Sequence, residues 1–179
     1  KLIVIDSREV ELTRYATIWM RPIPGTESAL LGGMLRVIVD EVLENEAFLR
    51  DKCENLEELK RSIWKFDLNR IESITGVSQD DIRAAARIFA QNGPAAILYA
   101  LDTIPHSEQS ECVSALVNLS LVTANIGRRH GGIYPLRPGT NDQGSWDIGC
   151  VPDLLPGYQD VSDAAARMSL GQVWGVEPP

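Results

Sequence analysis

Three short segments of this 179-residue chain combine charged or amide side chains with residues that allow sharp backbone turns. The first is Asp-Ser-Arg at residues 6–8, directly after an apolar run. The second is Pro-Gly-Thr-Glu at residues 24–27, where an apolar helical pattern begins. The third is Arg-Pro-Gly-Thr-Asn-Asp-Gln-Gly at residues 137–144. Each segment presents donors or acceptors that a polar ligand can use, so each is a candidate binding segment.

In the first segment, a carboxylate at the end of a strand accepts hydrogen bonds from a ribose hydroxyl or a base. Arg8 is then close enough in sequence to reach a phosphate. The alternative is that Asp6, Ser7 and Arg8 form a turn that ends the strand and is stabilised by local hydrogen bonds. The residues by themselves favour this structural interpretation.

In the second segment, a tight turn leads into a helix whose first backbone N–H groups face an approaching ligand. Ionised Glu27 accepts hydrogen bonds only, and its two oxygens match the two adjacent donors on guanine. The alternative is that Thr26 caps the helix and Glu27 complements the helix dipole. The residues by themselves again favour the structural interpretation.

In the third segment, Arg137, Asn141 and Gln143 present several donors to one polar ligand, or belong to an exposed connection. Elsewhere, His106 and His130 have no partners at metal-ligand spacing, so we predict no metal site. The chain also has no glycine-rich dinucleotide fingerprint, phosphate-binding lysine loop or hydrolase serine elbow. The commonest nucleotide and hydrolase signatures are therefore excluded.

Composition narrows the classes of partner. The net charge of -8, from 25 acidic and 17 basic residues, argues against nucleic acid. The apolar runs are too short to cross a bilayer, so we expect no direct membrane insertion and a soluble, cytoplasmic protein. The three cysteines are far apart and odd in number, which excludes a disulfide framework and a CxxC motif.

Apolar runs and helical patterns alternate along residues 1–135. Strands are predicted at residues 2–5, 17–20 and 95–100. Helices are predicted at residues 9–15, 27–44, 46–53, 56–64 and 68–73, from after Ser78 to Gly93, and at residues 111–126. Ser78 and Asp81 form a capping-box-like start, and Asn125 and Gly127 are helix-ending signals. The alternation predicts an α/β fold with a Rossmann-like, doubly wound, mainly parallel sheet and helices on both faces.

After Arg128, glycine and proline are frequent, and regular structure is expected largely to cease. We therefore predict one domain at residues 1–135 and a loop-rich segment at residues 136–179 that leads into a neighbouring domain. The chain begins without methionine and ends without a terminating element. These features suggest a piece of a longer polypeptide.

Taken in order, five motifs resemble the molybdopterin oxidoreductases of the dimethyl sulfoxide reductase family. They lie at residues 5–8, 24–31, 74–77, 125–127 and 137–144, with Leu-Pro-Gly-Tyr at residues 155–158 after the last. The greatest similarity is to formate dehydrogenase alpha subunits and to the G subunit of NADH-quinone oxidoreductase. The ordered set is more specific than any single motif, and it extends from Leu2 to about Tyr158.

The resemblance implies that residues 1–135 help to bind one of two molybdopterin guanine dinucleotides. Residues expected on the guanosine side are Asp6, Arg8, Gly25, Thr26 and Glu27, and those on the pterin side are Asn141 and Gln143. In an active enzyme Arg137 binds substrate near the metal. Iron–sulfur clusters lie outside these residues, and the expected partners are the other domains of the polypeptide and further subunits of a respiratory or formate dehydrogenase complex. That complex can hold the protein at the inner face of the membrane.

The chain departs from the family pattern at several positions. Ser7 replaces a proline and Glu27 an aspartate, while Gly139 and Pro105 stand where formate dehydrogenases carry cofactor-contacting glutamines. Losing an amide contact to a buried polar atom costs about 1–3 kcal/mol, so the departures favour the NADH-quinone oxidoreductase type. The alternatives are a structural scaffold domain with a degenerate, cofactor-free site and a free-standing nucleotide-binding domain. The chain lacks the family's cluster cysteines and molybdenum ligand, so it is not expected to be active alone.

Overall fold

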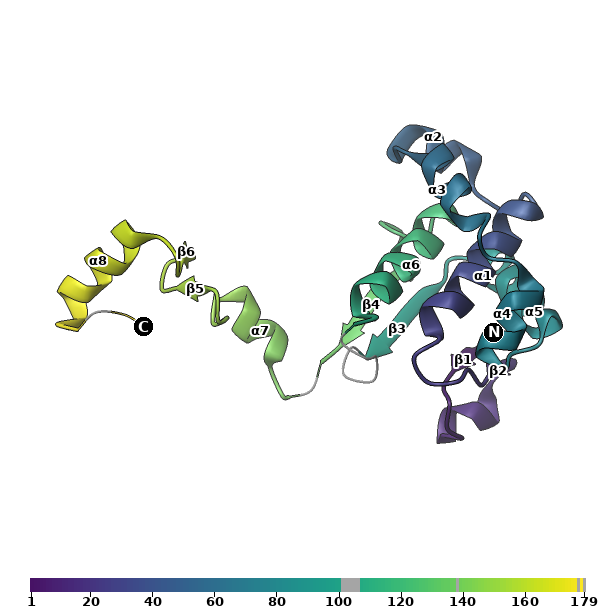
Figure 1. The fold of residues 1–179 in the computed structure, drawn as a ribbon, viewed down its shortest axis with the longest axis horizontal. Coiled ribbons are helices and arrows are strands. Elements are labelled where there is room, and N and C mark those ends of the chain that lie inside the picture. Colours follow the sequence, from purple (N-terminus) through teal and green to yellow (C-terminus); the bar gives the residue numbers. More distant parts are fainter. Residues whose placement is uncertain (101–106, 138, 177, 179) are drawn as a thin grey trace. The chain divides into compact units, whose positions relative to one another are not determined.

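A computed structural model of the protein describes residues 1–100, 107–137, 139–176 and 178. These residues form two compact units, Lys1–Leu136 and Arg137–Pro179 (Figure 1). The sequence predictions made for Pro105 and His106 lie outside the described residues, as does Pro138 within the third polar segment.

Unit 1 contains two pairs of parallel strands. β1 (Ile3–Ile5) pairs with β2 (Ile18–Met20), and the 3-10 helix η1 (Glu11–Tyr15) connects them. β3 (Ala96–Ala100) pairs with β4 (Gly132–Leu136). The α/β class and the parallel pairing confirm the sequence prediction, and the hydrogen bonds of the described residues join the strands two by two. β4 was not predicted, because its glycine and proline resemble a loop; an edge position accommodates such residues.

Most helices of unit 1 pack against α1. Their bounds are α1 (Glu27–Asp40), α2 (Glu46–Lys52), α3 (Leu56–Ile63), α4 (Leu68–Thr75), α5 (Gln79–Gln91) and α6 (Gln109–Val122). α1 packs against α4, α5 and α6, and its Leu30, Val37 and Ile38 are fully buried. It ends before the predicted residue 44, because Val42 adopts a left-handed conformation with φ 54°. The broad apolar pattern of α1 therefore forms the centre of the core.

The start of α5 and the end of α6 can be compared with the capping and helix-ending residues that the sequence predicted for them. Ser78 caps α5 as expected, since its Oγ accepts from the Asp81 N–H and donates to the Asp81 carboxylate at 2.7 Å. The predicted end of α6 was wrong, because the helix stops at Val122 and not at residue 126. Asn125 instead lies buried beyond the helix, where its Oδ1 accepts from the Ala95 N–H at 2.9 Å. It thereby connects the end of α6 to the start of β3.

Unit 2 has more regular structure than the sequence predicted. It contains α7 (Asp142–Asp147), the antiparallel pair β5 (Leu154–Leu155) and β6 (Gln159–Asp160), and α8 (Ala164–Trp174). The Asp163 carboxylate caps α8 by accepting from the Ala165 and Ala166 N–H groups, and Gly175 follows it at φ 69°. These are ordinary start and stop signals for a helix. The expectation that regular structure largely ceases is therefore wrong for this segment.

The helices were also compared with the dimensions of a membrane span. No helix within the described residues is long and apolar enough to cross a bilayer.

Candidate functional site

The first polar segment forms a turn at the end of β1. The Asp6 backbone N–H donates to the Met20 carbonyl at 3.2 Å, and the Trp19 indole N–H donates to the Asp6 carbonyl at 2.9 Å. The Asp6 Oδ1 accepts from the Arg8 backbone N–H at 2.8 Å, and the Arg8 Nε lies 3.8 Å from the same oxygen. The local hydrogen bond of the structural interpretation is thus present. The exposed Arg8 guanidinium is held only weakly.

The second segment forms the start of α1. Gly25 adopts φ 85°, and its N–H donates to the Glu27 Oε2 at 2.9 Å. Thr26 occupies the N-cap position but does not cap, which corrects the expectation for its hydroxyl; the hydroxyl donates to the Ile23 carbonyl at 2.6 Å. Glu27 is therefore the side chain that accepts a backbone hydrogen bond here. Each oxygen of an ionised carboxylate has two lone pairs, so this bond leaves capacity for a ligand.

The starts of α1 and α6 lie close together. Ser28 in the first turn of α1 donates from its Oγ to the Glu108 Oε2 at 3.3 Å, and Glu108 is the residue that precedes α6. Burial, reinforced by the nearby carboxylates of Glu27 and Glu108, raises the pKa of the Cys112 thiol to about 11. Two carboxylates thus flank one buried thiol at these helix starts.

Sequence reasoning did not identify Glu108 as part of this region. It expected α6 to begin at residue 111, whereas the helix begins at Gln109. The polar run Ser-Glu-Gln at residues 107–109, directly before an apolar helical pattern, is the signal that could have located the helix start.

The predicted residues of unit 1 share one edge of the sheet. β1 and β2 run parallel, so their carboxyl ends lie at the same edge, where Asp6 and the turn at residues 21–26 follow. In α/β folds this edge, with the N–H groups of the adjacent helix start, is where polar ligands bind. Asp6 and Arg8 follow β1 at this edge, and Gly25, Thr26 and Glu27 follow β2 at the start of α1, so each segment offers carboxylate acceptors or backbone donors there.

The third segment is organised around Arg137 in unit 2. The Arg137 Nη1 lies 3.5 Å from the Asp142 Oδ2, and its guanidinium lies over the Trp146 ring at 4.3 Å from the centroid. The Arg137 Nε is buried without a hydrogen-bond partner. Arg137 is therefore held by local contacts and retains an unsatisfied donor.

The two amide residues of this segment differ in their contacts. The Gln143 Nε2 donates to the Asp147 Oδ1 at 2.7 Å, one turn further along α7. Asn141 precedes α7 and is exposed. Its side chain packs against Gly144, because a Cβ added to this glycine would lie only 2.5 Å from the Asn141 Oδ1. Gly139 adopts φ 95°, with open space around it. Within the described residues, no group of three His, Cys, Asp or Glu side chains is placed to hold a metal ion.

These features define an α/β domain whose polar segments lie at strand ends and helix starts. The chain is 39% identical to formate dehydrogenase H of Escherichia coli K12 over 177 residues, 99% of this chain and 25% of that protein. It is 36% identical to the F420-dependent formate dehydrogenase subunit alpha of Methanocaldococcus jannaschii over 163 residues, 91% of this chain and 24% of that protein. It is 34% identical to the assimilatory nitrate reductase catalytic subunit of Bacillus subtilis over 174 residues, 97% of this chain and 24% of that protein.

Among solved structures, acetylene hydratase from Pelobacter acetylenicus matches with a TM-score of 0.68 and 33% identity, covering 71% of this chain and 18% of that one. No family model matches the sequence. The chain thus belongs to the molybdopterin oxidoreductase family, which confirms the resemblance in the sequence. It spans about a quarter of the length of the formate dehydrogenases it matches.

Proposed function

We propose that the protein carrying this chain is a molybdopterin-dependent oxidoreductase of the formate dehydrogenase type, and that unit 1 binds the guanosine end of a molybdopterin guanine dinucleotide. The observation that carries the proposal is the Glu27 carboxylate, which the Gly25 N–H holds at the start of α1. The formate dehydrogenases among the relatives support the reaction class.

The residues of the sheet edge fit a guanosine group. Glu27 accepts from the ring N–H and the exocyclic amino group of guanine, and Asp6 accepts from a ribose hydroxyl. Gly25 has no side chain to obstruct the approach of a ligand to the N–H groups of the α1 start. Arg8 exchanges its 3.8 Å contact with Asp6 for a phosphate.

Substrate and pterin contacts are assigned to unit 2. Arg137 orients formate through a charge-assisted hydrogen bond, and its contacts to Asp142 and Trp146 fix the guanidinium for this role. Asn141 and Gln143 contact the pterin side, which requires Gln143 to leave Asp147. When bound, the cofactor would supply the two-electron chemistry, and iron–sulfur clusters elsewhere in the full-length polypeptide would accept the electrons.

The guanosine role is tested by Glu27→Gln in the full-length protein, with Glu27→Asp and the distant, exposed Glu11→Gln as controls. Glutamine places a donor against guanine's donors, so we expect about 5- to 100-fold weaker retention of the dinucleotide. The measurement is guanosine monophosphate released by acid hydrolysis, alongside molybdenum and tungsten content. Glu27→Asp and Glu11→Gln should retain both. Unchanged guanosine content in Glu27→Gln would contradict the assignment.

The substrate role is tested by Arg137→Lys in the same full-length protein. Lysine keeps the charge but loses the planar donor pair, so kcat/KM for formate should fall at least about tenfold. Cofactor content is measured in parallel, because a loss of cofactor would lower turnover for another reason. Full formate turnover with normal cofactor content would remove Arg137 from the substrate site.

One observation favours a second candidate, a scaffold domain of an NADH-quinone oxidoreductase G-like subunit with no cofactor. Gly139 replaces the family's glutamine and adopts φ 95°, a conformation that a glutamine rarely takes. Stoichiometric molybdenum or tungsten with two guanine dinucleotides per full-length protein would exclude the scaffold, and their absence would favour it. In both cases we propose a cytoplasmic protein that contacts its own remaining domains and further subunits.

A further inference from the structure

The turn that follows β1 is held by two side chains of the neighbouring strand. The Trp19 indole N–H donates to the Asp6 carbonyl at 2.9 Å, and the Arg21 Nε donates to the Ser7 carbonyl at 2.9 Å. Trp19 lies in β2 and Arg21 directly follows it, so both bonds cross from one strand to the other. Two consecutive carbonyl groups of the turn are thus fixed from outside the turn.

Trp19 and Arg21 also contact each other. Side chains two residues apart along a strand leave the same face of the sheet. The Arg21 guanidinium carbon lies 5.8 Å from the centroid of the Trp19 ring, within the range of a cation–π contact. We call this pair, Trp19 and Arg21, the brace of the turn.

The turn itself has few contacts that fix its shape. These are the bond from the Arg8 N–H to the Asp6 Oδ1 and the 3.8 Å contact between the two side chains. Position 7 is a serine, and its backbone has more freedom than that of proline. Within the described part of the chain, the Ser7 N–H makes no hydrogen bond. The brace is therefore the main constraint on the direction of the Asp6 carboxylate.

We propose that Trp19 and Arg21 are positioning residues of the guanosine site, which hold the turn so that the Asp6 carboxylate faces the ligand. This inference rests on the proposed function, in which Asp6 accepts from a ribose hydroxyl. A carboxylate that already faces its donor binds without a further ordering cost. Neither residue of the brace needs to contact the dinucleotide.

The first test removes one donor of the brace at a time in the full-length protein, by Trp19→Phe and by Arg21→Met. Loss of the dinucleotide is timed at a urea concentration below the unfolding transition, from the guanosine monophosphate that acid hydrolysis releases from the protein. Each variant lacks one hydrogen bond, so the loss should be about 2- to 10-fold faster. Equal rates in the wild type and both variants would overturn the proposal.

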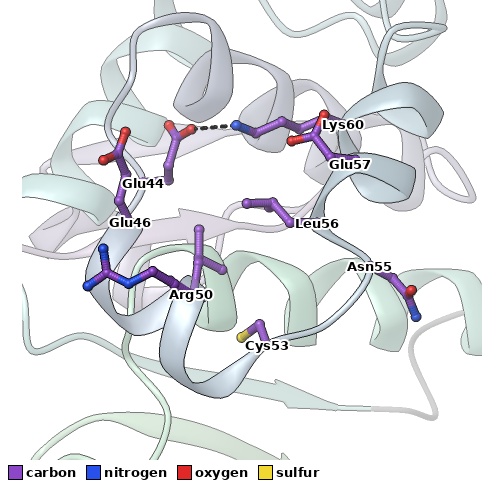
Figure 2. A pocket seen from close by; sticks show the side chains of 9 residues that line it. Glu44, Glu46, Arg50, Cys53, Asn55, Leu56, Glu57 and Lys60 are labelled. Carbon is purple, nitrogen blue, oxygen red and sulfur yellow. Dashed lines mark ion pairs between the residues drawn. The ribbon is translucent and has the colours of Figure 1, made fainter.

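Two control variants remove the same charge without touching the brace. Arg14 is exposed in η1, close to the turn in sequence. Arg50 lies in α2, at the opposite end of unit 1 from β1 and β2 in Figure 1, beside the surface depression drawn in Figure 2. Arg14→Met and Arg50→Met should leave the rate of loss unchanged. A faster loss in either control would show that net charge, and not the brace, sets the rate.

Ser7→Pro separates positioning from a direct contact between Arg21 and a phosphate. The Asp6 N–H donates to the Met20 carbonyl, which extends the pairing of β1 with β2 by one residue, and extended backbone is what a residue before proline prefers. Ser7→Pro also keeps the carbonyl at position 7. Added to Arg21→Met, it should restore the rate to within about twofold of the wild type, because the ring constrains the turn in place of the brace. A direct phosphate contact predicts no such rescue, and it also predicts no effect of Trp19→Phe.

Hydrogen exchange follows the turn itself. The Arg8 N–H donates to the Asp6 Oδ1 at 2.8 Å, so its exchange rate, measured at single-residue resolution, reports how often the turn opens. Exchange should be about 2- to 10-fold faster in Trp19→Phe and in Arg21→Met, and unchanged in Arg14→Met. Unchanged exchange in both brace variants would show that the turn does not need the brace.

Asp6→Asn separates this inference from the function on which it rests. The substitution keeps an oxygen that accepts from the Arg8 N–H but replaces the other acceptor by a donor. If Asp6→Asn leaves the loss of dinucleotide unchanged, the guanosine assignment of Asp6 fails, and the positioning role fails with it. If Asp6→Asn speeds the loss but Trp19→Phe and Arg21→Met do not, the assignment of Asp6 stands and only the positioning role is contradicted.

Discussion

The two units of this chain bury their apolar residues to different extents. Unit 1 buries α1 on several sides, with Leu30 and Ile38 fully inaccessible. Among the described residues of unit 2, Leu155 and Ala166 are the buried hydrophobic residues, while Val173 remains 78% exposed. Unit 1 thus supplies its own core. Unit 2 carries apolar side chains whose burial requires a surface outside the unit.

The same difference applies to the candidate binding segments. Glu27 is positioned by a helix whose opposite face is buried in the core. Arg137 is positioned by contacts to Asp142 and Trp146 within its own short segment. The geometry around Glu27, on the proposed guanosine side, is therefore a property of a packed domain, whereas that around Arg137, on the proposed substrate side, depends on local contacts.

The two units should differ most in how much the truncation of an apolar side chain lowers the free energy of unfolding. Ile82 in α5 is completely buried, so Ile82→Ala should lower the free energy of unfolding by about 2–5 kcal/mol. Ile148 in unit 2 is 71% exposed, so Ile148→Ala should change the free energy of unfolding by less than about 0.5 kcal/mol. Chemical denaturation measures both. A large loss from Ile148→Ala would show that unit 2 has a core of its own and would break the comparison.

Thiol reactivity should show the next contrast. Burial raises the pKa of the buried Cys112 thiol to about 11, while Cys150 is exposed. Near neutral pH this lowers the reactive thiolate at Cys112 roughly 100-fold, before burial slows access further. Timed alkylation with iodoacetamide and peptide mass spectrometry should label Cys150 first. Equal labelling rates would show that unit 1 opens readily at α6.

The same raised pKa has a consequence for stability. The folded protein holds the Cys112 proton more tightly than the unfolded chain does. The contribution of the Cys112 thiol to the free energy of unfolding is therefore complete below the ordinary thiol pKa. This contribution is lost as the pH rises toward about 11.

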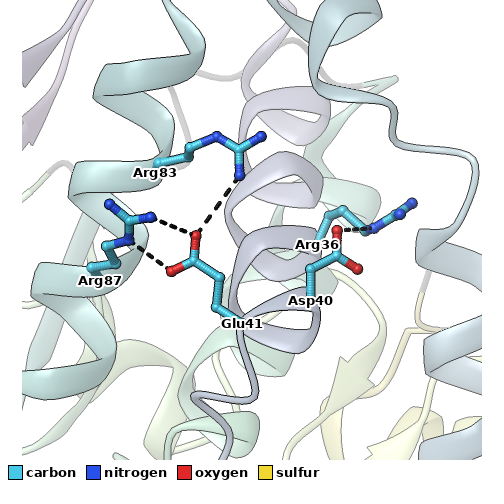
Figure 3. Close-up of polar contacts among 5 residues, drawn as sticks. All are labelled: Arg36, Asp40, Glu41, Arg83 and Arg87. Atoms are coloured by element: carbon cyan, nitrogen blue, oxygen red, sulfur yellow. Dashed lines mark hydrogen bonds and ion pairs between the residues drawn. The ribbon is translucent and has the colours of Figure 1, made fainter.

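The smallest expected effect concerns an ion pair between α1 and α5. Glu41 accepts from the Arg87 Nε and Nη2 at 2.7 and 2.8 Å, and the Arg83 Nη1 lies 3.7 Å away (Figure 3). The hydrogen bond from Arg87 is the main cause of the lowered pKa of Glu41. Because Arg87 is half-exposed and solvent screens its charge, Arg87→Gln should lower the free energy of unfolding only slightly at neutral pH.

The pH dependence of this pair has a defined sign. A carboxyl with a lowered pKa in the folded state contributes stability above its unfolded pKa, about 4.3, and loses it as the pH falls through the folded pKa. Denaturation of wild-type and Arg87→Gln proteins should therefore converge under acidic conditions. Arg50→Gln is a control, because its contact to Asp51 is highly exposed. A pH-independent cost of Arg87→Gln would point to packing of its stem instead.

The sequence alone was enough to identify the α/β class and, among the described residues of unit 1, the strands β1, β2 and β3 and the helices α1 to α6. These elements carry continuous apolar runs or helical stripes, and such patterns report burial directly. The ordered motifs also identified the family, because their combination over the whole chain is specific even though each motif is short.

Tertiary structure decided the features that depend on partners distant in sequence. β4 forms because it pairs with β3, although α6 separates the two strands in the sequence. No local sequence pattern predicts that pairing. Asn125 resembles a helix stop, yet it accepts from Ala95, which lies far away along the chain. At the candidate site, Glu27 accepts the Gly25 N–H, and Ser28 donates to Glu108, which directly precedes α6. Local propensity identifies which groups can bond, and packing selects which of them come within reach.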